Sequence, residues 1–167
     1  MAVIPCLVPT LSWLIRGLRS VYHSKLSKLI APPRVKIFLW LLLLDRLLTQ
    51  ENLSIRNWPS NGGCPCCPGN VQETSLHLFL LYPFARSIWD LTQQHLSFPM
   101  LLFPTNLQGF WLQNIINLGA AWDTIRAAVS WTIWKERNNR IFSSSVKPPS
   151  VLVRDILSLV CFGKAMA

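Results

Sequence analysis

The sequence predicts a mostly α-helical protein, and three observations support that prediction. Apolar residues recur at helical spacing, most clearly at Val35, Phe38 and Leu42. The proline pairs Pro32-Pro33 and Pro148-Pro149 stand where helices would begin, because proline is tolerated in the first turn of a helix. No stretch alternates apolar and polar residues convincingly over the length of a β-strand.

The first expected helix covers residues 32–48, and a short second helix begins after Thr49. Thr49 is a good N-cap residue, and Glu51 falls in the first turn, where the helix dipole favours negative charge. Residues 57–68 are rich in proline, glycine, asparagine and cysteine, so we expect an irregular loop there.

More helices are expected beyond that loop. Thr74 or Ser75 caps the next one, and Pro83 either breaks it or begins another. Residues 97–106 form a proline-interrupted connector. The remaining expected helices cover residues 107–117, residues 121–142 and the stretch that follows Pro148.

The length and composition indicate one globular domain with an unusually apolar surface. The chain has 167 residues, enough for a real core, and 51% of them are hydrophobic, including eight tryptophans. Only 14% are charged, which leaves little polar material to cover the outside. We therefore expect exposed apolar patches, which would serve a protein partner or mark a fragment of a larger protein.

The charge balance favours a phosphate-bearing partner. The chain has 16 lysines and arginines against 7 acids, a formal charge of +9. Such chains bind RNA or DNA with low sequence specificity. The cations are scattered, and the nearest approach to a cluster is Lys135, Arg137 and Arg140. A solvated helical face explains that trio as well as a nucleic-acid contact does.

The cysteines and the apolar stretches bear on the compartment. Five cysteines, three of them within four positions, do not form a secreted disulfide framework, so a reducing intracellular setting (nucleus or cytoplasm) is favoured. Residues 1–15 make a weak signal peptide, because Pro5 and Pro9 interrupt them and no basic segment precedes them. The apolar run over residues 37–44 is too short to cross a membrane and is expected to be a buried helical turn.

A short Cys/His motif is the strongest functional signal in the chain. Cys64 and Cys67 have Cys-x2-Cys spacing, and His77 follows after nine residues. Structural zinc takes four such ligands in tetrahedral geometry. Tyr82 stands where the fourth ligand is expected, and a phenol is a poor substitute for a thiolate. On an unbroken helix His77 and Tyr82 would point about 140° apart. Because a residue before proline avoids helical angles, Tyr82 is expected at a corner that turns it back toward the same point.

The order of several segments resembles a known family. Together they cover roughly residues 31–142 and comprise Ala31–Trp40, Asp45–Thr49, Asn52-Leu53, Arg56, Cys64–Cys67, Glu73-Thr74, His77–Phe79, Pro83–Ala85, Trp89 and Ile133–Phe142. In this order they resemble the zinc-binding domain that follows the reverse transcriptase in plant non-LTR (LINE-type) retroelements. The resemblance places the metal ligands of that family on Cys64, Cys67 and His77, with its last cysteine replaced by Tyr82.

Two interpretations of the motif remain open at this stage. Cys66 occupies a position that is usually not a ligand in the family, and it would add a third thiolate only in a strained geometry with Cys67. Either zinc is held with an incomplete protein ligand set, or the cysteine loop packs on the helices in reduced form without metal.

The whole chain divides into four expected parts. These are an N-terminal segment over residues 1–30, a zinc-binding-type domain over 31–96, a helical extension over 97–142 and a C-terminal helix over 143–167. The fold class is therefore a small helical domain around a Cys/His loop, with a C-terminal helical extension.

The acidic residues argue against catalysis. Phosphoryl chemistry of the reverse transcriptase or ribonuclease H type needs clustered carboxylates that hold metal ions. Asp45, Asp90, Asp123 and Asp155 lie on separate expected helices. We expect a non-enzymatic domain whose ancestral task was to help a reverse transcriptase bind nucleic acid. The alternative is a protein-interaction module or a degenerate fragment without metal.

Overall fold

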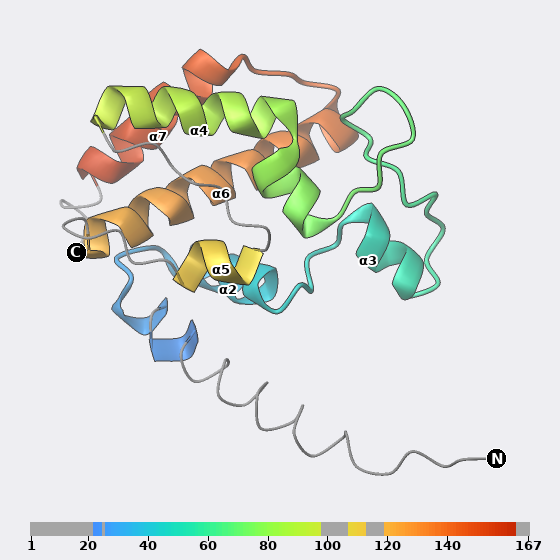
Figure 1. The fold of residues 1–167 in the computed structure, drawn as a ribbon, viewed down its shortest axis with the longest axis horizontal. Helices are drawn as coiled ribbons and strands as arrows, with labels where there is room; N and C mark the ends of the chain where they lie inside the picture. Colours follow the sequence, from blue (N-terminus) through green and yellow to red (C-terminus); the bar gives the residue numbers. More distant parts are fainter. Residues whose placement is uncertain (1–21, 25, 98–106, 113–118, 163–167) are drawn as a thin grey trace, which may run out of the picture.

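Three helices, α4 (Pro83–Leu96), α6 (Gly119–Ser143) and α7 (Pro149–Phe162), pack together at the centre of the molecule (Figure 1). The computed structural model describes residues 22–24, 26–97, 107–112 and 119–162. Helix α7 packs against both α4 and α6, so these three helices form a continuous layer. In the view of Figure 1, α4 and α7 lie above the long helix α6, and further helices lie below it.

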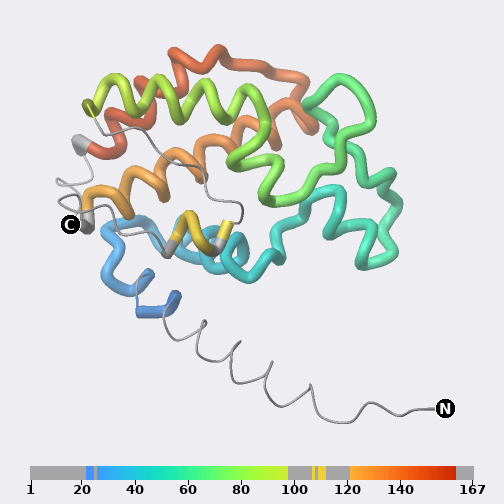
Figure 2. Tube along the Cα trace, in the orientation of Figure 1, coloured from blue at the N-terminus to red at the C-terminus, as the bar shows by residue number. Residues whose placement is uncertain are grey.

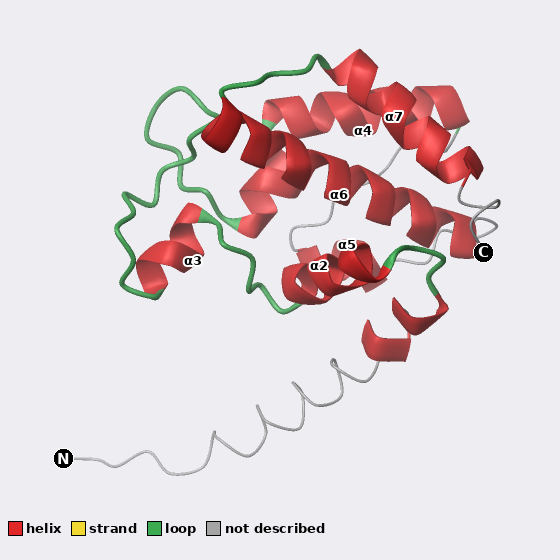
Figure 3. Cartoon of the chain, turned by 180° about the vertical axis from the view of Figure 1, so that it is seen from behind, coloured by secondary structure: helices red, strands yellow, loops and turns green. Residues whose placement is uncertain are grey.

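Helices α2 (Pro33–Leu43) and α5 (Leu107–Leu112) cover the other side of α6, and helical residues 22–24 and 26–28 precede α2 (Figure 2). Helix α3 (Gln50–Ile55) and the loop that follows it project at one end of the molecule, as the view from behind also shows (Figure 3). The mostly α prediction is confirmed. Within the described residues no strand is present, and the β-structure there is an antiparallel bridge between Gly63 and Gln72.

One hydrophobic core joins all the larger helices. Leu39 and Leu42 of α2, Ile88 of α4 and Ile156 of α7 are fully buried in the same cluster, which also includes Ile133 of α6. The expected helical turn over residues 37–44 supplies part of this core. The four-part division of the chain stays a prediction, while the core itself runs from Tyr22 to Ile156.

Aromatic side chains hold α5 in place. The ring of Trp89 on α4 meets that of Phe110 edge-on at 5.2 Å between centroids, and Trp122 lies within 6.4 Å of both rings. Arg126 is fully buried beside these rings and forms an ion pair with Asp123. Burial lowers the pKa of Arg126, and Asp123 partly offsets that effect.

The first helix ends earlier than its apolar pattern predicts. Helix α2 stops at Leu43 rather than Leu48, because Asp45 adopts the left-handed conformation with φ 52°. The amide of Asp45 donates to Leu42 O and that of Arg46 donates to Leu41 O, which is a Schellman ending. Short polar aspartate tolerates this conformation better than most residues do.

The predicted N-cap at Thr49 is confirmed, since its side chain accepts a hydrogen bond from the Asn52 amide. The predicted helix over residues 107–117 is described only as far as Leu112, and α6 begins at Gly119, two residues before the expected start. The weak signal peptide over residues 1–15 and most of the connector over 97–106 lie outside the described residues. None of the helices in the described parts of the chain is both long and apolar enough to cross a lipid bilayer.

Candidate metal centre

Two thiols and an imidazole converge at the projecting end of the molecule. The ligand atoms of Cys64, Cys67 and His77 all lie within 4.8 Å of one another, and Cys67 Sγ is 3.2 Å from His77 Nε2. Among the described residues, no other three His, Cys, Asp or Glu side chains gather in this way. The sequence motif is therefore a spatial cluster.

The loop that carries the cysteines is folded back on itself by backbone hydrogen bonds. The Cys64 amide donates to Val71 O at 2.6 Å, and the Glu73 amide donates to Gly62 O at 2.9 Å. Gly62 has φ 71°, a conformation that glycine adopts without steric cost. The Cys67 amide donates to Cys64 O at 3.4 Å, which curls the Cys-x2-Cys segment so that both thiols face the same point.

A single π-helical turn brings His77 and Tyr82 to the same side of the backbone. The turn, η1, covers His77–Leu81, and the Tyr82 amide donates to His77 O at 2.7 Å, five residues back. The two rings consequently lie 5.9 Å apart between centroids, instead of on divergent faces of an α-helix. Thr74 caps the start of this segment by accepting from the His77 amide at 2.9 Å. Tyr82 has ψ 125°, which confirms the predicted corner before Pro83.

The hydroxyl of Tyr82 is already used in other contacts. It donates to Cys66 O at 3.1 Å and accepts from Arg140 Nη1 at 2.8 Å. Burial raises the pKa of Tyr82 to about 12, although the Arg140 charge acts in the opposite direction. A neutral phenol with both hydrogen-bonding roles filled is a poor metal ligand. Tyr82 therefore anchors the loop to α6.

The thiols differ in how readily each loses its proton. A hydrogen bond from the Cys66 thiol, together with bonds from His77 and Cys67, lowers the pKa of Cys64 to about 5 against the cost of burial. Burial raises the pKa of Cys67 to about 11, and the neighbouring Cys64 adds to this effect. Because it donates to Cys64, Cys66 has a raised pKa, and its thiol falls outside the three-atom cluster.

The cluster fits a zinc ion. Zinc bonds of about 2.3 Å to sulfur and about 2.0–2.1 Å to nitrogen place tetrahedral ligand atoms about 3.5–3.8 Å apart. The three ligand atoms all lie within 4.8 Å of one another, and those of Cys67 and His77 are 3.2 Å apart, so they are close enough to share one ion. The donors are soft thiols and an imidazole, the set that suits zinc. Three such donors would fill three of the four positions that structural zinc offers.

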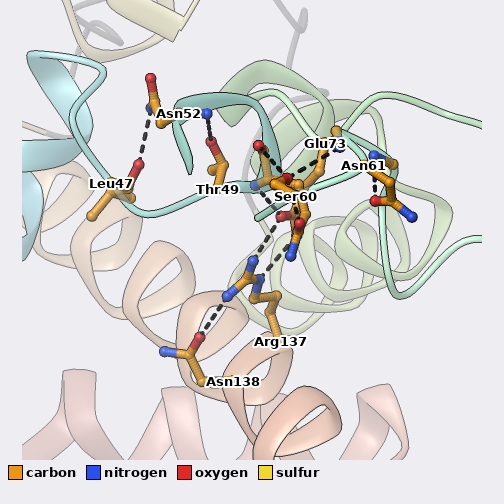
Figure 4. Close-up of polar contacts among 11 residues, drawn as sticks. Leu47, Thr49, Asn52, Ser60, Asn61, Glu73, Arg137 and Asn138 are labelled. Carbon is orange, nitrogen blue, oxygen red and sulfur yellow. Dashed lines mark hydrogen bonds and ion pairs between the residues drawn. The ribbon is translucent and has the colours of Figure 1, made fainter. Parts of the chain in front are cut away.

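A buried ion pair ties the cysteine loop to α6. Arg137 donates to Glu73 through Nε at 2.9 Å and through Nη2 at 2.7 Å, and the Glu73 side chain is fully buried (Figure 4). Glu73 also accepts from the Gln50 amide at 2.8 Å, at the start of α3. One carboxylate therefore joins α3, the loop and α6, and two parallel charge-assisted bonds make this joint specific.

Arg140 makes a second joint one turn further along α6. Its Nε donates to Glu136 at 2.9 Å, its guanidinium lies 3.8 Å from the centroid of the Phe84 ring, and it holds the Tyr82 hydroxyl. The predicted nucleic-acid contact at Lys135, Arg137 and Arg140 stays a prediction, and the structure places the three side chains differently. Arg137 is buried and Arg140 is bound to internal partners, so only Lys135 remains exposed. Residues two apart on a helix point about 160° apart, which separates Lys135 from Arg137.

The segment that contains the Cys/His cluster is similar to a known family. Residues 16–89 match the family described as zinc-binding in reverse transcriptase. This segment is therefore similar to the reverse-transcriptase zinc-binding domain. The resemblance that the sequence indicates is thereby confirmed, and the matched segment contains all three clustered side chains together with Tyr82.

A protein of Arabidopsis thaliana that bears the name of a ribonuclease H protein is also similar. It is 32% identical over 137 residues, which covers 75% of this chain and 21% of that relative. The chain therefore spans about a fifth of the length of this curated relative. No solved structure matches the chain significantly. The reverse-transcriptase zinc-binding domain is an accessory region rather than a catalytic one.

The carboxylates have structural partners or lie apart. Asp45 accepts from Ser75 Oγ at 2.6 Å, Asp123 pairs with Arg126, and Asp90 and Asp155 are exposed on separate helices. Glu73 matched the family in sequence without any role assigned to it. The sequence signal for a role of Glu73 was its position directly before the predicted helix cap, in a chain with only 7 acids. Its partner, 64 residues away, gave no local pattern.

Proposed function

We propose that this chain is a non-catalytic zinc-binding module from a retroelement polyprotein, which helps a reverse transcriptase hold nucleic acid. The observation that supports this most is the convergence of Cys64, Cys67 and His77 within 4.8 Å. They would hold the ion, and Tyr82 would position the loop without ligating it. The zinc would fix the fold of the loop, as structural zinc does.

The charge distribution supports a nucleic-acid partner. The formal charge of +9 attracts phosphate backbones without reading sequence. The carboxylates of the chain do not gather in the way that two-metal phosphoryl chemistry requires, which supports an accessory role. RNA and DNA would both bind, with affinity that falls as salt is added.

Metal analysis of the purified full-length chain tests the zinc site. We expect one zinc per chain in the unsubstituted protein, and loss of that zinc in Cys64→Ser and in His77→Ala. Tyr82→Cys supplies the missing thiolate and should tighten zinc binding, whereas Tyr82→Phe, the matched control, adds no ligand. A chain that holds no zinc until Tyr82→Cys is introduced would show that the site has decayed in this protein.

A gel-shift assay at low and moderate salt tests the nucleic-acid role. We expect binding to single-stranded RNA and DNA that weakens steeply with salt. No binding at low salt, or binding that ignores salt, would contradict this role and leave the zinc result intact.

The second candidate is a protein-interaction module, which the exposed apolar side chains favour. Ile55, the last residue of α3, is 71% exposed, Trp58 just beyond it is 66% exposed, and Phe142 is 78% exposed at the end of α6. Co-expression with the adjoining reverse-transcriptase region would distinguish the two. Stable co-purification that is lost in Trp58→Ser would favour the interaction module.

A further inference from the structure

A groove of about 520 Å³ lies between the start of α2 and the outer side of α6, away from the cysteine loop. Apolar side chains line most of it, including Pro32, Pro33, Ala127 and Trp131. Trp131 is half-buried, and its ring is fixed by an edge contact with Phe38 at 5.2 Å. A fixed aromatic ring beside a concave apolar surface is the arrangement on which a flat ring system stacks.

The charges around the groove are positive. Arg34, Lys36 and Lys135 line it, and no acidic residue is among the described residues that do. Lys36 Nζ donates to Ser27 O at 3.3 Å and keeps further donors for another acceptor. Burial lowers the pKa of Lys135, and the nearby charges of Arg34 and Lys147 lower it further, although Asp155 acts in the opposite direction.

We propose that this groove binds one or two unpaired bases of a single-stranded nucleic acid. The bases would lie against Trp131 and the prolines, and the flanking phosphates would contact Arg34, Lys36 and Lys135. Three cations along an apolar groove complement a strand that alternates apolar ring faces with negative phosphates. The inference rests on the proposed nucleic-acid role and assigns a surface to it.

The shape of the groove favours a single strand over a duplex. Its volume is in the range of pockets that hold small ligands. A base inside a duplex reaches such a pocket only after it is unstacked and unpaired, which costs free energy. A single strand avoids that cost. Of the trio named from the sequence, Lys135 lines the groove.

The first test compares two charge-reversal pairs in the full-length chain. Arg34→Glu with Lys135→Glu changes the groove, and Arg46→Glu with Arg154→Glu produces the same change in net charge at exposed positions outside it. Affinity for a fluorescein-labelled oligouridine is measured by anisotropy over a salt series, with thermal melts to confirm folding. We expect about tenfold or greater weakening and a shallower salt slope for the groove pair, and less than about threefold for the control pair.

The second test asks whether bases enter the groove. An abasic strand of the same length keeps the phosphates, and we expect it to bind about 5–100-fold more weakly to the unsubstituted chain. Equal losses of oligouridine affinity in both variant pairs would overturn the groove assignment. Equal affinity for the abasic strand and for oligouridine would do the same. Neither result would contradict the proposed nucleic-acid binding. No binding of any strand at low salt would overturn the proposed nucleic-acid role as well. The groove pair could instead lose binding of an acidic amphipathic peptide, which the control pair still binds, and keep its affinity for oligouridine. That result would overturn the assignment and identify a protein as the occupant.

Discussion

The helical body and the cysteine loop are stabilised by different forces. Helices α4, α6 and α7 share a core in which Ile88 and Ile156 are fully buried. Residues 57–72 are mostly exposed, and backbone hydrogen bonds and a few polar side chains hold them. Apolar burial therefore stabilises the body, whereas the loop depends on its polar joints, to which a bound ion would add.

Helix α6 belongs to both regions. Its middle supplies Val129 and Ile133 to the core, and its last turns supply Arg137 and Arg140 to the loop. The joints lie on the helix that the core already fixes, so the loop is docked on a rigid support. A metal ion then needs to order only the loop itself.

The largest effect is expected at the joint. Arg137→Met leaves the fully buried carboxylate of Glu73 without its partner, and we expect a loss of about 3–5 kcal/mol in the free energy of unfolding. Urea denaturation measures this loss. Adding Glu73→Gln to Arg137→Met removes the unpaired buried charge. The double variant should therefore lose less free energy of unfolding than the sum of the losses in the two single variants. Strict additivity would show that the pair does not act as a unit.

A core substitution tests the body alone. Ile88→Ala creates a cavity at a fully buried position, and we expect a loss of about 3 kcal/mol. Because Ile88 lies in the metal-independent region, the loss should be the same with zinc and with a chelator. A loss that doubled in chelator would mean that the ion supports the body as well.

The hydroxyl of Tyr82 tests the loop. Tyr82→Phe removes the bonds to Cys66 O and Arg140, at an expected cost of about 1–2 kcal/mol. The cost should be larger in chelator, where no ion shares the task of holding the loop. Thermal melts at matched pH with and without chelator give the comparison. Identical shifts in melting temperature with and without chelator would show that the Tyr82 hydroxyl does not help to hold the loop.

The smallest expected effect is at the cap of α3. Thr49→Ala removes the acceptor for the Asn52 amide, and we expect a loss of about 1 kcal/mol. Thr49→Ser keeps that acceptor and is the matched control. Hydrogen exchange at the Asn52 amide should quicken in the alanine variant alone. Equal protection in both variants would show that the cap does not hold this turn.

The helices of the body could be predicted from the sequence, because local residue patterns determine where they lie. Apolar spacing and the proline starts predicted α2, α4 and α7, and the N-cap at Thr49 was visible in one residue. The predicted end of α2 was wrong, because hydrophobic periodicity does not reveal that Asp45 adopts the left-handed conformation.

The candidate site was predicted in part. The spacing of Cys64, Cys67 and His77 indicated the cluster, and the corner at Tyr82 followed from Pro83. The π turn did not follow, since apolar spacing over so few residues cannot distinguish it from an α turn. The Glu73–Arg137 pair did not follow either, because contacts between residues far apart in sequence depend on the assembled fold.

The central claim is that zinc takes two sulfurs and one imidazole from this chain, with Tyr82 held away by Arg140. X-ray absorption at the zinc edge of the loaded full-length protein measures the ligand set directly. We expect two sulfur ligands at about 2.3 Å and two lighter ligands, the His77 nitrogen and a water oxygen, at about 2.0–2.1 Å. Three sulfurs would bring in Cys66, and a shell without sulfur would contradict the account.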